Sequence, residues 1–148
     1  MAGISTYPYR MINREMGVEL TYLEMISARA LSYLSRGTKE RLRNGPGDRP
    51  LGIQLLGKDP YYILKALDRL RDYPFDVLGF NAACPQKKIT NNGKGACLLK
   101  EPKKLNLLLK CIVKHTAKPV TLKMRLGWDS PKYALKIALE AQDAGVSA

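Results

Sequence analysis

Residues 51–70, LGIQLLGKDPYYILKALDRL, contain one complete unit of strand, loop and helix. The apolar run 51–56 is typical of a buried strand. Asp59-Pro60 suits the N-cap and the first position of a helix. Apolar residues then recur at i, i+3, i+4 and i+7, which is the spacing of one buried helical face. These positions are Ile63, Ala66, Leu67 and Leu70.

The same unit recurs along the chain. Short apolar runs rich in strand-forming residues occur at 20–25, 76–80 and 119–124. Residues 1–4 resemble the tail of a further strand, and Val146 resembles the start of another. Strands that alternate with amphipathic helices indicate βαβ units and a parallel sheet. Two more helices are expected to begin at Glu101-Pro102 and Ser130-Pro131, with buried faces formed by Leu105, Leu108, Leu109 and Ile112 in the first and by Ala134, Ile137, Ala138 and Ala141 in the second.

Two parallel α/β architectures compete, an open doubly wound sheet and a closed barrel. The open sheet binds nucleotides at a Gly-rich turn after its first strand, and the GxGxxG pattern of that turn is absent. A barrel places function on the loops after every strand, and polar chemistry follows several strands here. We therefore predict a partial TIM barrel with about the first five βα units, because a complete barrel needs about 250 residues. Residues 1–148 are expected to form one truncated barrel domain, incomplete at both ends.

The charge balance of the chain points to a polyanionic partner. It has 25 Lys+Arg against 13 Asp+Glu, a formal net charge of +12. Such an excess favours nucleic acid first and an anionic membrane surface second, with a solubilising surface as the alternative. No apolar run is long enough to span a membrane, and no cleavable signal opens the chain. Three cysteines without CxxC spacing argue against disulfides and a zinc site, so we expect a reducing, cytoplasmic compartment and no metal.

Alternation along two strands places polar groups on the inner side of the predicted barrel. In 119–126, apolar residues alternate with Thr121, Lys123 and Arg125, and in 51–56 the apolar Leu51, Ile53 and Leu55 leave Gln54 on the other face. Burying cations without a partner is costly, so this inner face suits an anionic or electron-rich ligand. The alternatives are a solvated strand end, or pairing of the two cations with acids such as Glu24.

The loop after the strand 76–80 carries the most reactive group. Asn81 ends the strand, Cys84 stands three residues on and Pro85 fixes the turn after it. A cysteine there can act as a proton donor or nucleophile, whereas Cys97 and Cys111 fit structural packing roles in apolar helical patterns. Six lysines follow, with Gly93 and Gly95 among them, and could track a phosphate backbone; a solvated loop is the alternative. These lysines are Lys87, Lys88, Lys94, Lys100, Lys103 and Lys104.

Taken together, these stretches resemble the tRNA-dihydrouridine synthase family along essentially the whole chain. The most specific motifs are Asn-x-x-Cys-Pro at 81–85 and Lys-x-Arg-x-Gly-Trp at 123–128. Shorter similarities occur at 1–6, 22–25 and 54–57. The resemblance implies an FMN enzyme that reduces the carbon 5–carbon 6 bond of a tRNA uridine and takes its electrons from NADPH. It further implies flavin contacts for Met1, Ala2, Gln54 and Lys123, uracil contacts for Asn81 and Arg125, and protonation of carbon 5 by Cys84. The place of the basic loop beside this site favours RNA contacts for Lys87 and Lys88.

The chain departs from the family pattern at two positions. Tyr7 follows Thr6 where the family has aspartate, and Ala83 replaces the glycine before the cysteine. If that glycine requires a positive φ, alanine strains the loop and puts the orientation of Cys84 in doubt. Two rival functions stay open: a dihydroorotate- or dihydropyrimidine-dehydrogenase relative that acts on free pyrimidines, and an inactive RNA-binding paralogue. The high positive charge argues against the first.

Overall fold

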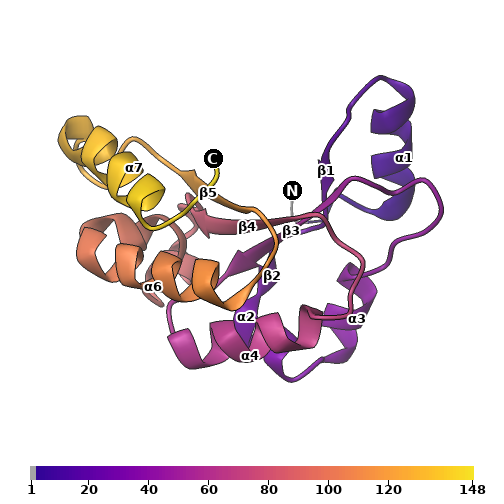
Figure 1. Ribbon diagram of the computed structural model, residues 1–148, viewed down its shortest axis with the longest axis horizontal. Coiled ribbons are helices and arrows are strands. Elements are labelled where there is room, and N and C mark those ends of the chain that lie inside the picture. Colours follow the sequence, from indigo (N-terminus) through magenta and orange to yellow (C-terminus); the bar gives the residue numbers. More distant parts are fainter. Residues whose placement is uncertain (1–2) are drawn as a thin grey trace.

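The computed structural model describes residues 3–148, which form a twisted parallel sheet flanked by helices (Figure 1). Every pair of neighbouring strands is parallel, and the order β1-β3-β4-β5 follows the chain without reversal, with β2 also paired to β3. A doubly wound sheet would reverse its order at a switch point, so the predicted α/β barrel arc is confirmed. The strands are β1 (Thr21–Tyr22), β2 (Ile26–Ser27), β3 (Leu51–Leu56), β4 (Val77–Ala82) and β5 (Val120–Met124).

Four helices, α2, α4, α6 and α7, pack one on the next along the strands. α2 packs on α4, α4 on α6, and α6 on α7, and Figure 1 shows α2, α4 and α6 lying side by side below the sheet. This is the outer layer of helices expected for a barrel. The α-helices are α1 (Tyr7–Glu15), α2 (Ala28–Ser32), α3 (Arg36–Arg41), α4 (Pro60–Leu70), α5 (Lys87–Thr90), α6 (Pro102–His115) and α7 (Ala134–Asp143), and the 3-10 helices are η1 (Gly95–Lys100) and η2 (Pro131–Tyr133).

The strand predicted at 20–25 is interrupted and ends later than predicted. β1 pairs Tyr22 with Gly52, and β2 pairs Ile26 with Leu55. The first segment therefore advances four residues while β3 advances three, and the extra residue bulges out of the ladder between β1 and β2. The apolar pattern could not reveal this interruption, because a bulge changes the pairing and leaves the composition unchanged.

Proline begins the predicted helices, but only some of the expected caps form. The Asp59 carboxylate accepts a hydrogen bond from the Tyr61 amide at 2.9 Å and caps α4. α6 also begins at its proline, although Glu101 makes no side-chain cap bond. The Ser130 hydroxyl accepts from the Lys132 amide at 3.2 Å, and the proline there opens η2 rather than the α-helix itself.

The helical faces predicted for α4 and α6 are buried throughout, while that of α7 is only half correct. All four predicted positions of α4 and of α6 are buried. In α7, Ile137 and Ala141 are buried but Ala138 is exposed and Ala134 half-buried. Among the described helices α7 packs mainly on α6. Because α7 has one main helical neighbour in this part of the chain, a narrower face of it is buried than in α4 and α6, each of which packs on two α-helices.

The predicted strand remnants at the two ends of the chain differ from each other. Gly3 and Ile4 form a turn, so the described part of the strand expected at 1–4 is not a strand; Met1 and Ala2 lie outside the described residues. Val146 starts a segment that does pair with β5. The Ser147 amide donates to the Val120 carbonyl at 2.7 Å, and the Leu122 amide donates to the Ala148 carbonyl at 2.8 Å.

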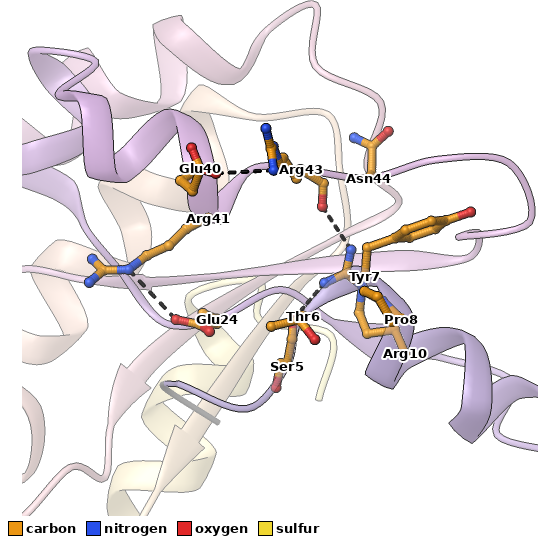
Figure 2. Close-up of a pocket in the computed structure, with 10 residues that line it drawn as sticks. All are labelled: Ser5, Thr6, Tyr7, Pro8, Arg10, Glu24, Glu40, Arg41, Arg43 and Asn44. Atoms are coloured by element: carbon orange, nitrogen blue, oxygen red, sulfur yellow. Dashed lines mark hydrogen bonds and ion pairs between the residues drawn. The ribbon is translucent and has the colours of Figure 1, made fainter.

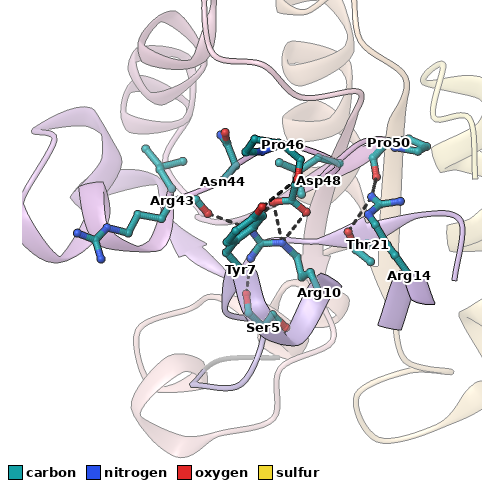
Figure 3. A network of polar contacts seen from close by, with 12 residues as sticks. Ser5, Tyr7, Arg10, Arg14, Thr21, Arg43, Asn44, Pro46, Asp48 and Pro50 are labelled. Atoms are coloured by element: carbon teal, nitrogen blue, oxygen red, sulfur yellow. Dashed lines mark hydrogen bonds and ion pairs between the residues drawn. The ribbon is translucent and has the colours of Figure 1, made fainter. Parts of the chain in front are cut away.

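A buried ion pair fastens α1 to the loop that leads into β3 (Figure 3). Arg10 is 2% exposed and Asp48 is 1% exposed. The guanidinium donates to the carboxylate from Nε at 3.0 Å and from Nη2 at 2.5 Å. Nη1 also donates to the carbonyl oxygen of Ser5 at 2.6 Å, and Nη2 to that of Arg43 at 2.9 Å. A charge buried this deeply needs a paired opposite charge and further hydrogen bonds of this kind.

Hydrogen bonds of two further charged side chains, Arg14 and Asp76, hold the start of β3. Arg14 donates to the Thr21 hydroxyl at 3.0 Å and to the Pro50 carbonyl at 2.5 Å, so α1 also contacts the starts of β1 and β3 (Figure 3). The Asp76 carboxylate accepts from the Leu51 amide at 2.8 Å and from Arg49. The hydrogen bonds from Arg49 hold the pKa of Asp76 below its ordinary value. These contacts set the register of β3 beside β4.

Replacing Asp48 by alanine tests the buried pair. Asp48→Ala leaves the Arg10 guanidinium buried without its carboxylate, and we expect the free energy of unfolding to fall by about 3–5 kcal/mol in denaturant titrations. Asp72→Ala is the control, because Asp72 is exposed and makes no ion pair or side-chain hydrogen bond within residues 3–148. We expect that variant to change stability by no more than about 0.5 kcal/mol. Equal losses in the two variants would contradict the structural role of the pair.

Candidate active site

The carboxyl ends of β3, β4 and β5 bring three predicted site residues onto one face of the sheet. Gln54 pairs with Gly79, and Asn81, two residues further along β4, pairs with Lys123. Paired residues of a parallel ladder direct their side chains to the same face. The Asn81 side-chain amide nitrogen donates to the Gln54 side-chain oxygen at 2.9 Å. Apolar side chains of these strands alternate with them and are buried toward the helices.

The ring of Tyr22 covers the sheet next to Gln54, Asn81 and Lys123. Tyr22 lies across Gly52 and Gly79, where an added Cβ would approach the ring to 2.4 Å and 3.1 Å. Its hydroxyl is hydrogen-bonded to the Thr121 hydroxyl at 3.2 Å, two strands away from β3. Both glycines are therefore needed for the ring to lie flat on the sheet. The alternation of apolar and polar residues does not indicate this contact, although two glycines inside apolar strands signal a close approach.

Asn81 also shapes the loop that carries the thiol. Its side-chain oxygen accepts hydrogen bonds from the backbone amides of Ala83 at 3.0 Å and Cys84 at 2.9 Å. The Asn81 oxygen is thus occupied by the loop and its nitrogen by Gln54. Since the Gln54 oxygen accepts from Asn81, its NH2 group is the part left to donate to a ligand. One amide therefore orients both the glutamine on the sheet and the backbone of Cys84.

Glycine at position 95 lets η1 pack directly against Cys84. Gly95 has φ +60°, and an added Cβ would lie 2.6 Å from the Cys84 carbonyl oxygen and 3.1 Å from the Cys84 Cβ. The next amide, of Ala96, donates to the same carbonyl at 3.0 Å. The backbone that the glycine brings close is therefore that of Cys84 itself.

The strain expected at Ala83 is absent. Among the described non-glycine residues only Leu34 has a positive φ, so the backbone of Ala83 has a conformation that alanine accepts without penalty. The condition under which alanine would strain this loop is therefore not met. The thiol is half-buried on a loop whose backbone Asn81 and Ala96 hold in place.

The predicted cations remain exposed around the site. Lys123, Arg125, Lys87 and Lys88 are exposed, and none of them forms an ion pair within the described part of the chain. Glu24, considered as a partner for the strand cations, lies 3.6 Å from Arg41 instead. β5 ends at Met124, so Arg125 lies beyond the strand. The alternation of side chains along a strand, from which its inward direction was predicted, therefore does not apply to Arg125. Lys87 and Lys88 begin α5, just after the loop of Cys84.

A separate cavity of about 550 Å³ lies between α1 and α3 (Figure 2). Its charges are balanced: Arg41 pairs with Glu24, Arg43 lies 3.1 Å from Glu40, and Arg10 is held by Asp48. Tyr7, which replaces the aspartate of the family pattern, donates its hydroxyl to the Pro46 carbonyl at 2.8 Å. The Tyr7 ring also packs on Gly45. This substitution therefore joins α1 to the loop before β3.

The other two cysteines and the histidine have different surroundings. Cys97 is half-buried in η1, whereas Cys111 is exposed on α6, so the interpretation of Cys111 as a packing residue was wrong. His115 ends α6 and hydrogen-bonds Asp68 at 2.9 Å, which lowers the pKa of that carboxylate. No group of three or more His, Cys, Asp or Glu in residues 3–148 could hold a metal ion. Within the same residues, no helix is long and apolar enough to cross a membrane.

Comparisons with known proteins agree along the whole chain. The family model described as dihydrouridine synthase (Dus) matches residues 1–148. The tRNA-dihydrouridine synthase B of Pseudomonas aeruginosa is 31% identical over 149 residues, which cover 100% of this chain and 45% of that protein. The enzymes of the same name from Pasteurella multocida and Pectobacterium carotovorum are 34% and 35% identical, again over 100% of this chain. The chain spans 45% and 46% of those two relatives.

The contact between Gly95 and Cys84 can be tested by substitution. We expect Gly95→Ala to lower the free energy of unfolding by about 1–3 kcal/mol, because it combines a positive φ with a backbone clash. It should also change the rate at which a small thiol reagent alkylates Cys84, followed by peptide mass spectrometry. Gly37→Ala is the matched control, since no atom lies within 4 Å of an added Cβ there. Identical stability and alkylation in both variants would show that the close approach is unimportant.

Proposed function

Because the chain belongs to the dihydrouridine synthase family, we propose that the protein containing it reduces a uridine in tRNA to dihydrouridine. The observation that carries the proposal is the hydrogen-bonded unit of Gln54, Asn81 and the Cys84 loop at the strand carboxyl ends. Catalytic groups of barrel enzymes lie at this end of the sheet. The relatives named tRNA-dihydrouridine synthase B support the same substrate class.

The residues on the inner face fit a flavin. The free NH2 group of Gln54 and the ammonium of Lys123 are donors that suit the polar edge of its ring system, and Tyr22 closes the sheet beneath them. Lys123 has no carboxylate partner among the described residues and would stabilise negative charge on a reduced ring. Met1 and Ala2 are further proposed flavin contacts. FMN bound here would supply the hydride for carbon 6 of uracil, with NADPH as the source of its electrons.

The chain itself supplies the proton and the positioning groups. The Cys84 thiol would donate its proton to carbon 5 as a hydride reaches carbon 6, so the double bond becomes saturated and the thiolate is later reprotonated from solvent. The oxygen of Asn81 accepts from the loop amides and one of its N–H groups donates to Gln54, so the second N–H group would donate to a uracil carbonyl. Arg125, exposed just beyond β5, would hold the other side of the base.

Electrostatics supports RNA rather than a free pyrimidine as substrate. The chain carries a net charge of +12, and Lys87 and Lys88, next to the Cys84 loop, form no ion pair within residues 3–148. Unpaired lysines beside a site attract a phosphate backbone and contribute little to recognition of a neutral base. A uridine must leave its stack to reach a pocket at the strand ends. Phosphate contacts next to the pocket would hold the RNA while the base is turned out.

Replacing Cys84 tests the proposed acid in the full-length protein. We expect Cys84→Ala to retain FMN and its reduction by NADPH, because the thiol takes no part in those steps. Dihydrouridine formation in unmodified tRNA, measured by mass spectrometry, should fall by about 100-fold or more. Cys97→Ala and Cys111→Ala should keep the rate. Full activity in Cys84→Ala would disprove the assignment, and a protein that takes up no FMN on reconstitution would disprove the flavin proposal.

Replacing the two lysines of α5 tests the RNA contact. We expect Lys87→Ala/Lys88→Ala to weaken tRNA binding and to reduce the slope of log affinity against log salt concentration by about 1–2 units, roughly one per lost phosphate contact. The charge-matched control is Lys110→Ala/Lys114→Ala, which removes two exposed lysines from the C-terminal half of α6. An unchanged slope in the α5 variant would assign its lysines to a solvated surface.

A further inference from the structure

A second cavity, of about 230 Å³, lies where α2, the start of α4 and the loop after α5 meet. Three cations line it, Arg29, Lys58 and Lys94, and none of them forms an ion pair within residues 3–148. The carboxylate of Asp59 also lines the cavity, but it is engaged as the cap of α4 through the Tyr61 amide. The cavity between α1 and α3 has paired charges, whereas this one has a surplus of positive charge. It is therefore suited to an anion.

The cavity is connected to the loop of Cys84. Lys58 lies along the backbone at Gly93, which has φ +66°, and an added Cβ there would lie 3.3 Å from the lysine Cδ and 3.4 Å from its Nζ. Lys94 follows directly, and Gly95 after it packs on the Cys84 carbonyl. An anion bound between Lys58 and Lys94 would therefore contact the segment that holds Cys84 in place.

Three tyrosines extend this surface along α2 and α4. The ring of Tyr62, which lines the cavity, lies 5.2 Å from Tyr61 and 6.1 Å from Tyr33, measured between centroids. Arg29 lies 5.3 Å from the centroid of Tyr62, and Lys65 lies 5.4 Å from Tyr33 and 5.8 Å from Tyr61. Tyr33 is 59% exposed and Tyr61 is 62% exposed. Exposed aromatic rings interleaved with cations are the groups that bind unpaired nucleotides, through stacking and phosphate contacts.

We propose that this surface is an accessory RNA-binding site: Arg29, Lys58 and Lys94 bind a phosphodiester, and the rings of Tyr33 and Tyr61 stack on an adjacent unpaired base. The proposal rests on the proposed function and deepens it by adding a place where the tRNA strand contacts the outside of the barrel. The unpaired cations, the overall charge of +12 and the continuity with the Cys84 loop favour RNA over a protein partner. Contact at this surface would couple RNA binding to the position of the loop.

The phosphate contact is tested with Lys58→Ala/Lys94→Ala in the full-length protein and an unmodified tRNA transcript. We expect weaker binding and a slope of log affinity against log salt concentration that is smaller by about 1–2 units. The control Lys110→Ala/Lys114→Ala should keep the parent slope. If the double variant unfolds, as judged by circular dichroism, Arg29→Ala is measured instead, with an expected slope change of about 1 unit. An unchanged slope in a folded variant overturns the phosphate site.

The stacking contact is tested at Tyr61. Tyr61→Ser should weaken tRNA binding by about 5- to 100-fold, whereas Tyr61→Phe, which keeps the ring, should bind like the parent. Tyr133→Ser removes a similarly exposed tyrosine from η2 and is the control. Equal affinities of the serine and phenylalanine variants overturn the stacking contact. A change of oligomeric state without a change in tRNA affinity also overturns it. A parent that binds no tRNA and forms no dihydrouridine refutes the proposed function, whereas a functional parent with unaffected variants refutes this surface alone.

Discussion

The pairing of β3 with its neighbours on both sides is the constraint on which the rest of the structure depends. β1 and β2 pair with one edge of β3 and β4 pairs with the other. The register of β3 places Gln54 opposite Gly79 and therefore beside Asn81, two residues further along β4. The contacts of Arg14 with Pro50 and of Asp76 with Leu51 fix the start of this strand. A shift of one residue would turn Gln54 toward the helices and remove the site.

The side chain of Asn81 joins the two halves of the candidate site. Through its nitrogen it orients the glutamine on the face where we propose that the flavin binds, and through its oxygen it holds the backbone of Cys84. In the proposed reaction a hydride donor and a proton donor would act on the two carbons of one bond, so their relative position would matter more than either group alone. A single amide bonded to both is a compact way to set that position. Gly95 completes the arrangement by packing on Cys84 from the other side.

Positive charge is used in two different ways in this chain. Arg10 is buried and Arg14 is half-buried, and they are engaged with a carboxylate, a hydroxyl and backbone carbonyls, so they stabilise the packing of α1 on the sheet. The lysines around the site and the cavity beside α4 have no carboxylate partner among the described residues. Unpaired, exposed cations contribute little to stability but raise the local attraction for a polyanion. The unpaired cations at the proposed RNA-binding surface are therefore available to attract a polyanion.

Local periodicity in the sequence was enough to determine the parallel α/β class, the buried faces of α4 and α6, and the face of the sheet that carries Gln54 and Lys123. These features depend on neighbouring residues, whose spacing reports directly on strand or helix geometry. Only the tertiary structure decided the pairing of Arg10 with Asp48, the reach of Tyr22 to Thr121 and the packing of Gly95 on Cys84. Tyr22 and Thr121 are separated by 99 positions. No pattern within one segment records such a contact, because it forms only when strand pairing has brought the distant segments together.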